Sequence, residues 1–238
     1  MSRTPPHRFD LGRRAVAEAV GTALLLATVI GSGVMGERLA GGNVAVALLA
    51  NTLATGAALV ALILTFGPIS GAHLNPAVTL ADAWQGGIAW RDVLPYIGAQ
   101  VIGAFVGVAA AHVMFELPLY FASQHARPGS AQMFSEFVAT FGLLAVIWGC
   151  VRARPSMVPF AVAAYITAAY WFTASTSFAN PAVTLARAAS DTFAGIRPSD
   201  APGFIAAQLF GAAAATGLFR WLVPTLPESA PDVVVRSR

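Results

Sequence analysis

The seven residues Asn-Pro-Ala-Val-Thr-Leu-Ala occur twice in this sequence, without a change, at positions 75–81 and 180–186. Asparagine is a good N-cap, and proline is favoured at the first helical position because its missing N–H is not needed there. Each copy therefore predicts the start of a short helix. Asn75 and Asn180 can cap these helices and still offer an amide N–H to a small solute, so the chemistry is recognition by hydrogen bonding.

Three ionisable side chains, Glu18, Glu136 and His73, stand within or beside apolar stretches. An ionisable group inside a membrane span is costly and usually functional. The glutamates could carry protons, as in a coupled transporter, or accept backbone N–H bonds and so brace nearby loops. Their symmetric placement near helix starts favours bracing. For His73 we expect a hydrogen-bonded loop residue packed behind the site, rather than a residue that contacts solute.

The composition indicates that membrane helices position these residues. Apolar residues make up 57% of the 238 positions and charged residues 11%, whereas soluble domains average about 45–50% and about 25%. A spanning helix needs about 20 mostly apolar residues. Six stretches meet this need, at residues 15–34, 44–66, 93–114, 133–151, 157–174 and 203–223. The two short helices, expected over residues 75–84 and 180–189, cannot span, and we predict an all-α membrane protein.

The repeat extends beyond the two motifs, because the surroundings of Glu18 recur around Glu136 at nearly the same offset. Each half of the chain, about 11–114 and 131–224, contains three spans and one short helix. An odd number of spans makes the second half enter the membrane from the opposite side, so the halves form an inverted repeat. Paired short segments at corresponding positions of such halves point to a permeation site.

In an inverted repeat of this kind we expect the N-termini of the two short helices to face each other. Their positive dipole ends oppose the passage of protons and other cations. Pro76 and Pro181 fix the helix starts, and Ala77 and Ala182 are small enough to let the two ends touch. Irregular backbone before each motif is tolerable at membrane depth where it lines a wet cavity.

The arginines indicate the topology of the chain. All 14 basic residues are arginine. With a cytoplasmic N-terminus, ten of them lie inside and four outside, which agrees with the positive-inside rule. We expect one channel domain over residues 11–224, with short cytoplasmic tails at 1–10 and 225–238.

Residues 70–79 (Ser-Gly-Ala-His-Leu-Asn-Pro-Ala-Val-Thr) and 178–182 (Phe-Ala-Asn-Pro-Ala), together with Glu18 and Glu136, resemble the major intrinsic protein family of aquaporins and aquaglyceroporins. The resemblance covers about residues 11–224. It implies six transmembrane helices with two re-entrant half-helices that meet at mid-membrane. It also implies a homotetramer with one pore per subunit, embedded in membrane lipid.

The sequence departs from the family at the outer constriction. Most members have arginine after the second Asn-Pro-Ala, where this chain has Val183. By spacing from the motifs, the other constriction positions are Thr55, Ala168 and Ser177. This small and nearly uncharged set predicts a wide constriction. Arg187, one helical turn beyond Val183, either reaches back toward the mouth or lies at the outer surface.

Valine at this position resembles a bacterial subgroup found with arsenic-resistance genes. The resemblance implies a channel for arsenite and methylated arsenicals in the bacterial inner (plasma) membrane, and the distribution of the arginines places both termini in the cytoplasm. We expect a passive channel for these and glycerol-like solutes, with some water. A water-selective aquaporin is the alternative, and a proton- or ion-coupled transporter is disfavoured because no span carries a relay of carboxylates or histidines.

Other classes of function lack support in the sequence. No nucleophile–base pair, metal-ligand cluster or phosphate loop is evident, so we expect no enzyme activity, no catalytic residue, no metal and no cofactor. The arginines are scattered and form no basic face, which disfavours nucleic acid as a partner.

Overall fold

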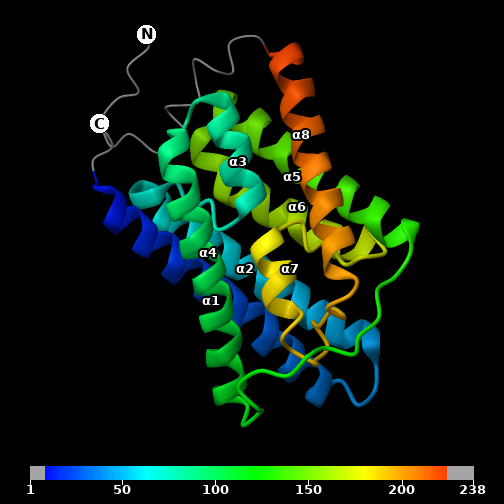
Figure 1. Cartoon of the computed structure of the whole chain (residues 1–238). Helices are drawn as coiled ribbons and strands as arrows, with labels where there is room; N and C mark the ends of the chain where they lie inside the picture. The colour runs from blue at the N-terminus through cyan, green and yellow to red at the C-terminus, as the bar shows by residue number, and fades with distance from the viewer. Residues whose placement is uncertain (1–8, 224–238) are drawn as a thin grey trace.

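Apolar runs rich in Ala, Val and Leu form the helices of this protein, which a computed structural model describes over residues 9–223 (Figure 1). The expected tails lie almost entirely outside that range. In chain order the helices are α1 (Leu11–Leu39), α2 (Val44–Ser70), α3 (Pro76–Gln85), α4 (Trp90–Met114), α5 (Ser130–Ala153), the 3-10 helix η1 (Pro155–Met157), α6 (Val158–Phe172), α7 (Pro181–Arg187) and α8 (Ala201–Leu222). All regular structure between residues 9 and 223 is helical, as predicted.

Five of these helices, α1, α2, α4, α5 and α8, are long and apolar enough to cross a membrane. The sixth expected span is α6, which has 15 residues. At about 1.5 Å per residue it is shorter than a bilayer core of about 30 Å. The 3-10 turn η1 precedes it, and at Thr173 the chain becomes extended and enters the segment that leads to Asn180.

Large apolar side chains cover the outside of the bundle. Leu94 is 79% exposed, Phe210 is 71% exposed and Trp221 is 76% exposed. Exposing such groups to water costs about 25 cal/mol per Å² of apolar surface, a cost that lipid removes. The outer surface therefore fits the membrane environment that the composition predicts.

Corresponding helices pack in the same way in both halves: α1 packs on α2 and α4, and α5 packs on α6 and α8. Glycine permits the close approach of backbones that membrane helices use. A Cβ atom on Gly103 would lie 2.2 Å from the carbonyl oxygen of Ala19, and one on Gly211 would lie 2.5 Å from that of Phe137. The small-residue contacts of α4 and α8 are thus made within the chain.

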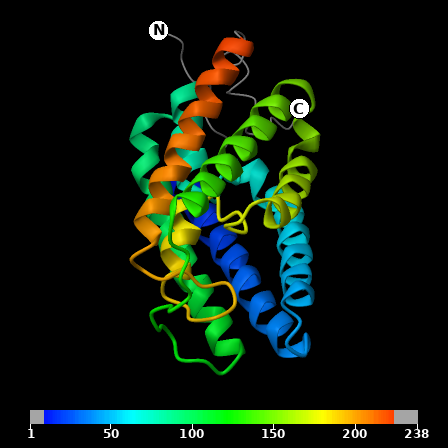
Figure 2. The same ribbon diagram turned by 90° about the vertical axis from the view of Figure 1, so that its right-hand side faces the viewer.

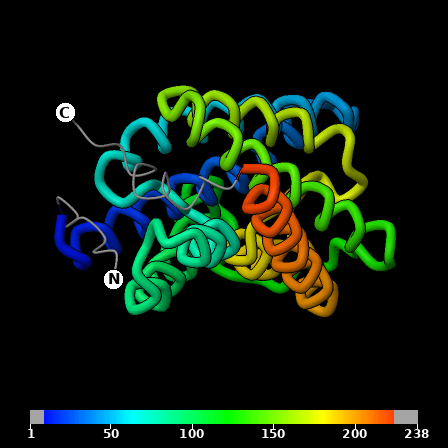
Figure 3. Tube along the Cα trace, turned by 90° about the horizontal axis from the view of Figure 1, so that it is seen from above, coloured from blue at the N-terminus to red at the C-terminus, as the bar shows by residue number. Residues whose placement is uncertain are grey.

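The two short helices enter from opposite sides and approach each other in the middle of the bundle (Figures 1 and 2). α3 ends beside the end of α8, where Arg220 Nη1 donates to the carbonyl of Trp84 at 2.9 Å. Seen from above, the yellow α7 lies beside the orange start of α8 (Figure 3). We call the side where α1 begins and α8 ends the terminal side, and the opposite side the loop side.

The contact between α1 and α4 can be tested with two glycines on one helix. Gly103→Ala forces a methyl group against the Ala19 carbonyl, whereas Gly98 has no such neighbour within 4 Å. We expect Gly103→Ala to lower the free energy of unfolding by about 1–3 kcal/mol, seen as a lower melting temperature in detergent. Gly98→Ala is the control, and equal melting temperatures for the two variants would contradict this packing.

Candidate functional site

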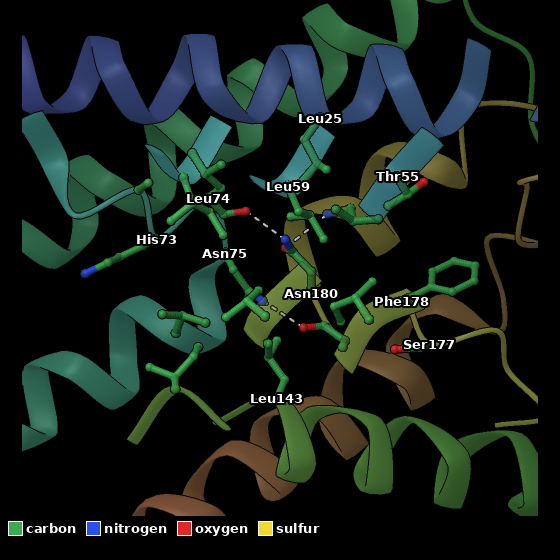
Figure 4. Close-up of a pocket in the computed structure, with 18 of the residues that line it drawn as sticks. Leu25, Thr55, Leu59, His73, Leu74, Asn75, Leu143, Ser177, Phe178 and Asn180 are labelled. Carbon is green, nitrogen blue, oxygen red and sulfur yellow. Dashed lines mark hydrogen bonds between the residues drawn. The ribbon is translucent and has the colours of Figure 1, made fainter. Parts of the chain in front are cut away.

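The two motif asparagines tie the halves of the chain together. Asn75 Oδ1 accepts from the amide of Ala77 at 2.9 Å, and its Nδ2 donates across the interface to the carbonyl of Ala179 at 2.8 Å. Asn180 Oδ1 likewise caps its own helix, and its Nδ2 donates to the carbonyl of Leu74 at 2.7 Å (Figure 4). A side-chain amide has two N–H donors, so each asparagine keeps one beyond this crossed pair.

The segments that lead into the two motifs share an unusual backbone. The residues one and three positions before each asparagine are left-handed although none is glycine: Ala72 (φ 47°), Leu74 (φ 49°), Ser177 (φ 51°) and Ala179 (φ 47°). Such conformations cost on the order of 1 kcal/mol or more each and persist where the surroundings hold them. Other side chains must therefore hold these two segments in their left-handed conformations.

Glu18 supplies that support in the first half. Its Oε1 accepts from the amide of His73 at 2.9 Å, and its Oε2 accepts from the amide of Leu74 at 2.6 Å. The carboxylate also accepts from Ser70 Oγ at 2.7 Å and from Gln100 Nε2 at 2.8 Å. Four donors satisfy a charge that is wholly buried.

Glu136 makes the corresponding contacts in the second half. It accepts from the amides of Phe178 and Ala179, both at 2.8 Å, and from Gln208 Nε2 at 2.6 Å. Neither glutamate lines the cavity described below. The contacts are those of a brace behind each re-entrant segment rather than of a proton relay along a pore.

A cavity runs between the two half-helices and the helices α1, α2, α5 and α6. Apolar side chains of α1, α2, α5 and α6 form most of its wall, among them Leu25, Leu59 and Leu143 (Figure 4). The motif asparagines and the segments before them form the polar wall at the middle of the cavity. A passage of this kind offers hydrogen bonds along one side and an apolar surface on the other.

The remaining motif residues lie where α3 and α7 meet. Ala77 and Ala182 are fully buried and, like Pro76 and Pro181, do not line the cavity. Contacts join α3 to α7 directly. Small side chains at the second helical position are what this close approach of two helix ends requires.

Three of the four expected constriction residues, Thr55, Ser177 and Val183, line the cavity. The prediction for Ala168 was wrong, because Ala168 is exposed on the outer face of α6. The lining face of α6 repeats every fourth residue, as Val158, Val162, Ile166 and Tyr170. Ala168 is two residues out of phase, about 200° around the helix.

Tyr170 takes the place that spacing had assigned to alanine. Its hydroxyl donates to Thr55 Oγ1 at 3.4 Å, across the cavity wall from α6 to α2. The spacing of four residues between the lining side chains of α6 is the sequence pattern that could have identified Tyr170. The loop-side end of the cavity is therefore more polar and less open than a set of Thr, Ala, Ser and Val implies.

Arg187 also lines the cavity, so of its two predicted positions the structure places it at the mouth. The side chain is 2% exposed; its Nε donates to the carbonyl of Ala194, and its Cζ lies 3.3 Å from the centroid of the Phe178 ring. Arg127, which sequence reasoning did not single out, stacks at 5.0 Å on the same ring. Among the described residues neither arginine forms an ion pair with a carboxylate.

The charges of these two arginines affect the protonation of His125 in the nearby loop. Burial, followed by the charges of Arg127 and Arg187, lowers the pKa of His125 below its ordinary value. His125 is consequently neutral at physiological pH and adds no third positive charge at the loop side.

His73 lies at the opposite end of the cavity. It is hydrogen-bonded, as expected, but it is among the lining residues and does not pack behind the site. Its Nδ1 lies 3.1 Å from Thr79 Oγ1, and its Nε2 lies 3.4 Å from Asp82 Oδ2. Asp82, which the sequence analysis did not select, lines the same end.

Comparisons with known proteins agree with this geometry. The family model described as Major intrinsic protein matches residues 7–159. Aquaglyceroporin AqpS of Rhizobium meliloti is 54% identical over 231 residues, which cover 94% of this chain and 99% of that protein. Aquaporin Z of Bradyrhizobium diazoefficiens is 33% identical over 156 residues, 60% of this chain and 64% of that protein.

A likeness of fold extends to a solved structure, the X-ray structure of the aquaglyceroporin from Plasmodium falciparum. It matches with a TM-score of 0.66 at 21% identity and covers 91% of this chain and 99% of that one.

The bracing contacts of Glu18 predict a loss of stability on neutralisation. Glu18→Gln keeps one acceptor oxygen but turns an NH₂ group toward backbone donors. Because hydrogen bonds to a charged group contribute about 1.5–3 kcal/mol, we expect a clear fall in the detergent melting temperature. Glu37→Gln, at an exposed position of the same helix, is the control. A melting temperature that stays at the control value would exclude the bracing role.

Cysteine labelling can test the corrected face of α6. In a Cys150→Ala background, we expect Tyr170→Cys to react with a charged, water-soluble thiol reagent at least about tenfold faster than Ala168→Cys. The reason is that the reactive thiolate forms in water and not against lipid. Preferential labelling at position 168 would restore the spacing-based assignment.

Proposed function

The chain belongs to the major intrinsic protein family, and from that premise we propose that it is a passive channel for arsenite, methylated arsenicals and glycerol-like solutes, with some passage of water. The long apolar helices and the family relationship make it a multi-pass membrane protein with a channel for small solutes. The choice among solutes depends on the loop-side end of the cavity.

One observation carries the proposal: Val183, directly after the second Asn-Pro-Ala, lines the cavity where a guanidinium stands in most members of the family. Valine offers no donor and occupies less of the passage than arginine. The guanidinium of Arg187 lies one turn further along α7 and packs against the ring of Phe178. A solute bulkier than water meets less obstruction at the position of Val183.

The polarity of the wall supports a neutral, hydroxylated solute. Thr55, Tyr170 and Ser177 bring hydroxyl groups to the loop-side end, while apolar side chains form the opposite wall. Arsenous acid is uncharged and close to glycerol in size and in its pattern of hydroxyl groups. Each can exchange hydrogen bonds with the polar side and lay its remaining surface against the apolar side.

The relatives support a glycerol-type channel over a channel for water alone. The 54% identical relative is named an aquaglyceroporin, and its similarity extends over nearly the whole chain. A water-selective channel is the second candidate, favoured by the likeness to Aquaporin Z. The rings of Tyr170 and Phe178 and the guanidinium of Arg187 favour this candidate too, because they reduce the space that the sequence predicted.

We also propose a topology and an assembly. Both termini face the cytoplasm, so that the terminal side is the inner side, and the protein lies in a bacterial plasma membrane. This orientation places most of the arginines inside, as the positive-inside rule requires. The subunits associate as homotetramers with one pore each.

Liposome fluxes test the proposal. We expect the reconstituted protein to pass arsenite and glycerol faster than empty liposomes do, and Val183→Arg to reduce both fluxes at least about tenfold, equal to about 1.4 kcal/mol of added barrier. Water flux, measured by osmotic shrinkage, should fall far less, because a water molecule needs less space. Val183→Met is the matched control, since it adds length without charge or donors.

Two results would contradict this proposal. If only water moves through the wild-type protein, the chain is a water channel. If Val183→Arg leaves arsenite and glycerol fluxes unchanged, Val183 does not control passage and the constriction lies elsewhere.

A further inference from the structure

The residue that follows the repeated heptapeptide differs in charge between the two halves: it is Asp82 in the first copy and Arg187 in the second. Both side chains line the same cavity. The preceding lining residues also correspond pair by pair, as Asn75 with Asn180 and Val78 with Val183. The inverted repeat therefore presents equivalent positions to the passage, with a carboxylate toward the terminal side and a guanidinium toward the loop side.

The carboxylate of Asp82 is buried but incompletely paired. It is 2% exposed, and its Oδ1 has no hydrogen-bond partner among the described residues. Its Oδ2 lies 3.4 Å from His73 Nε2. A Cβ atom on Gly87 would lie 2.2 Å from Oδ1, so the glycine of the turn after α3 leaves room for the carboxylate. Buried acceptors are normally hydrogen-bonded, so a free carboxylate oxygen at the cavity wall needs an explanation, and an effect on passing ions supplies one.

The guanidinium of Arg187 has no carboxylate partner either among the described residues. Helical rise places Asp82 and Arg187 each about 10 Å along its half-helix from the capping asparagine, on opposite sides of the pore centre. The energy of a charge interaction falls as the distance grows. Each charge therefore acts mainly on its own end of the passage.

Cations and anions meet different electrostatic barriers in the cavity. Cations are repelled by Arg187 and by the two helix N-termini at the centre. Both of these features attract anions. Among the described residues that line the cavity, Asp82 is the only carboxylate. An anion that passes Arg187 and the centre meets a repelling charge at Asp82 and nowhere else on this wall.

Building on the proposed channel function, we propose that Asp82 is the barrier to anions and that Arg187, its repeat equivalent, is the matching barrier to cations. An ion of either sign must pass both residues in series, so it meets at least one repulsive site whatever its direction. Neutral solutes meet neither barrier. A passage without an arginine directly after the second motif can in this way remain closed to ions.

The test is the ion selectivity of planar bilayers that contain the purified protein, with a KCl gradient across them. We expect the wild type to show no conductance above that of lipid. Asp82→Asn should raise the conductance at least about tenfold, with a reversal potential close to the equilibrium potential of chloride. Adding Arg187→Gln to Asp82→Asn should move the reversal potential toward that of potassium.

Charge-conserving variants provide the controls. Asp82→Glu and Arg187→Lys keep the signs of both charges and should remain non-conducting. Melting temperature and elution volume in detergent show that each variant is folded. The proposal is overturned if folded Asp82→Asn does not conduct, if its conductance has no preference for chloride, or if Asp82→Glu conducts equally.

Glycerol flux in liposomes, measured on the same preparations, separates this proposal from the proposed function. If the wild type passes no glycerol, the solute assignment fails, while the reversal potential of Asp82→Asn still decides the role of Asp82. If the wild type passes glycerol and Asp82→Asn gives no chloride conductance, the role of Asp82 fails and the solute assignment stands.

Discussion

The structure depends on satisfying backbone N–H groups at mid-membrane, where the chain is neither helix nor strand. Lipid supplies no hydrogen bonds, and an unsatisfied polar group there costs several kcal/mol. Glu18 and Glu136 meet this need by accepting the amides just before each motif asparagine. Burying two carboxylates is expensive, but each is paired with three or four donors. The left-handed residues ahead of each motif follow from this arrangement.

Once the segments before Asn75 and Asn180 are fixed, local contacts determine the shape of the rest of the passage. The crossed bonds from Asn75 and Asn180 fix the two half-helices against each other. Ala77 and Ala182 make room for that contact, and the glycines of α4 and α8 let the flanking helices close in. The apolar walls then enclose a cavity whose polar groups come mostly from the repeated segments, with Thr55 of α2 and Tyr170 of α6 added at the loop-side end.

Much of this could be predicted from the sequence, and the failures have physical causes. The helical class and the family, predicted from hydropathy and an identical heptapeptide, are confirmed. Ala168 was misplaced because counting from a motif gives a position along α6 but not the rotation of the helix. The reach of Arg187 and the nearness of Asp82 to His73 depend on side-chain conformations and loop packing, which a local pattern does not encode. The crossed asparagine bonds join residues about a hundred positions apart, and no spacing rule reveals them.

The inverted repeat also explains how two similar halves can give the passage two different ends. The seven identical residues of each copy build the parts that must match, namely the cap, the proline start and the close contact of the helix ends. The residue after them, Asp82 or Arg187, takes no part in that contact and was free to differ. Because the halves are inverted, the same position points to opposite ends of the cavity. A difference at the one position after the shared heptapeptide is therefore enough to give the passage a negative end and a positive end.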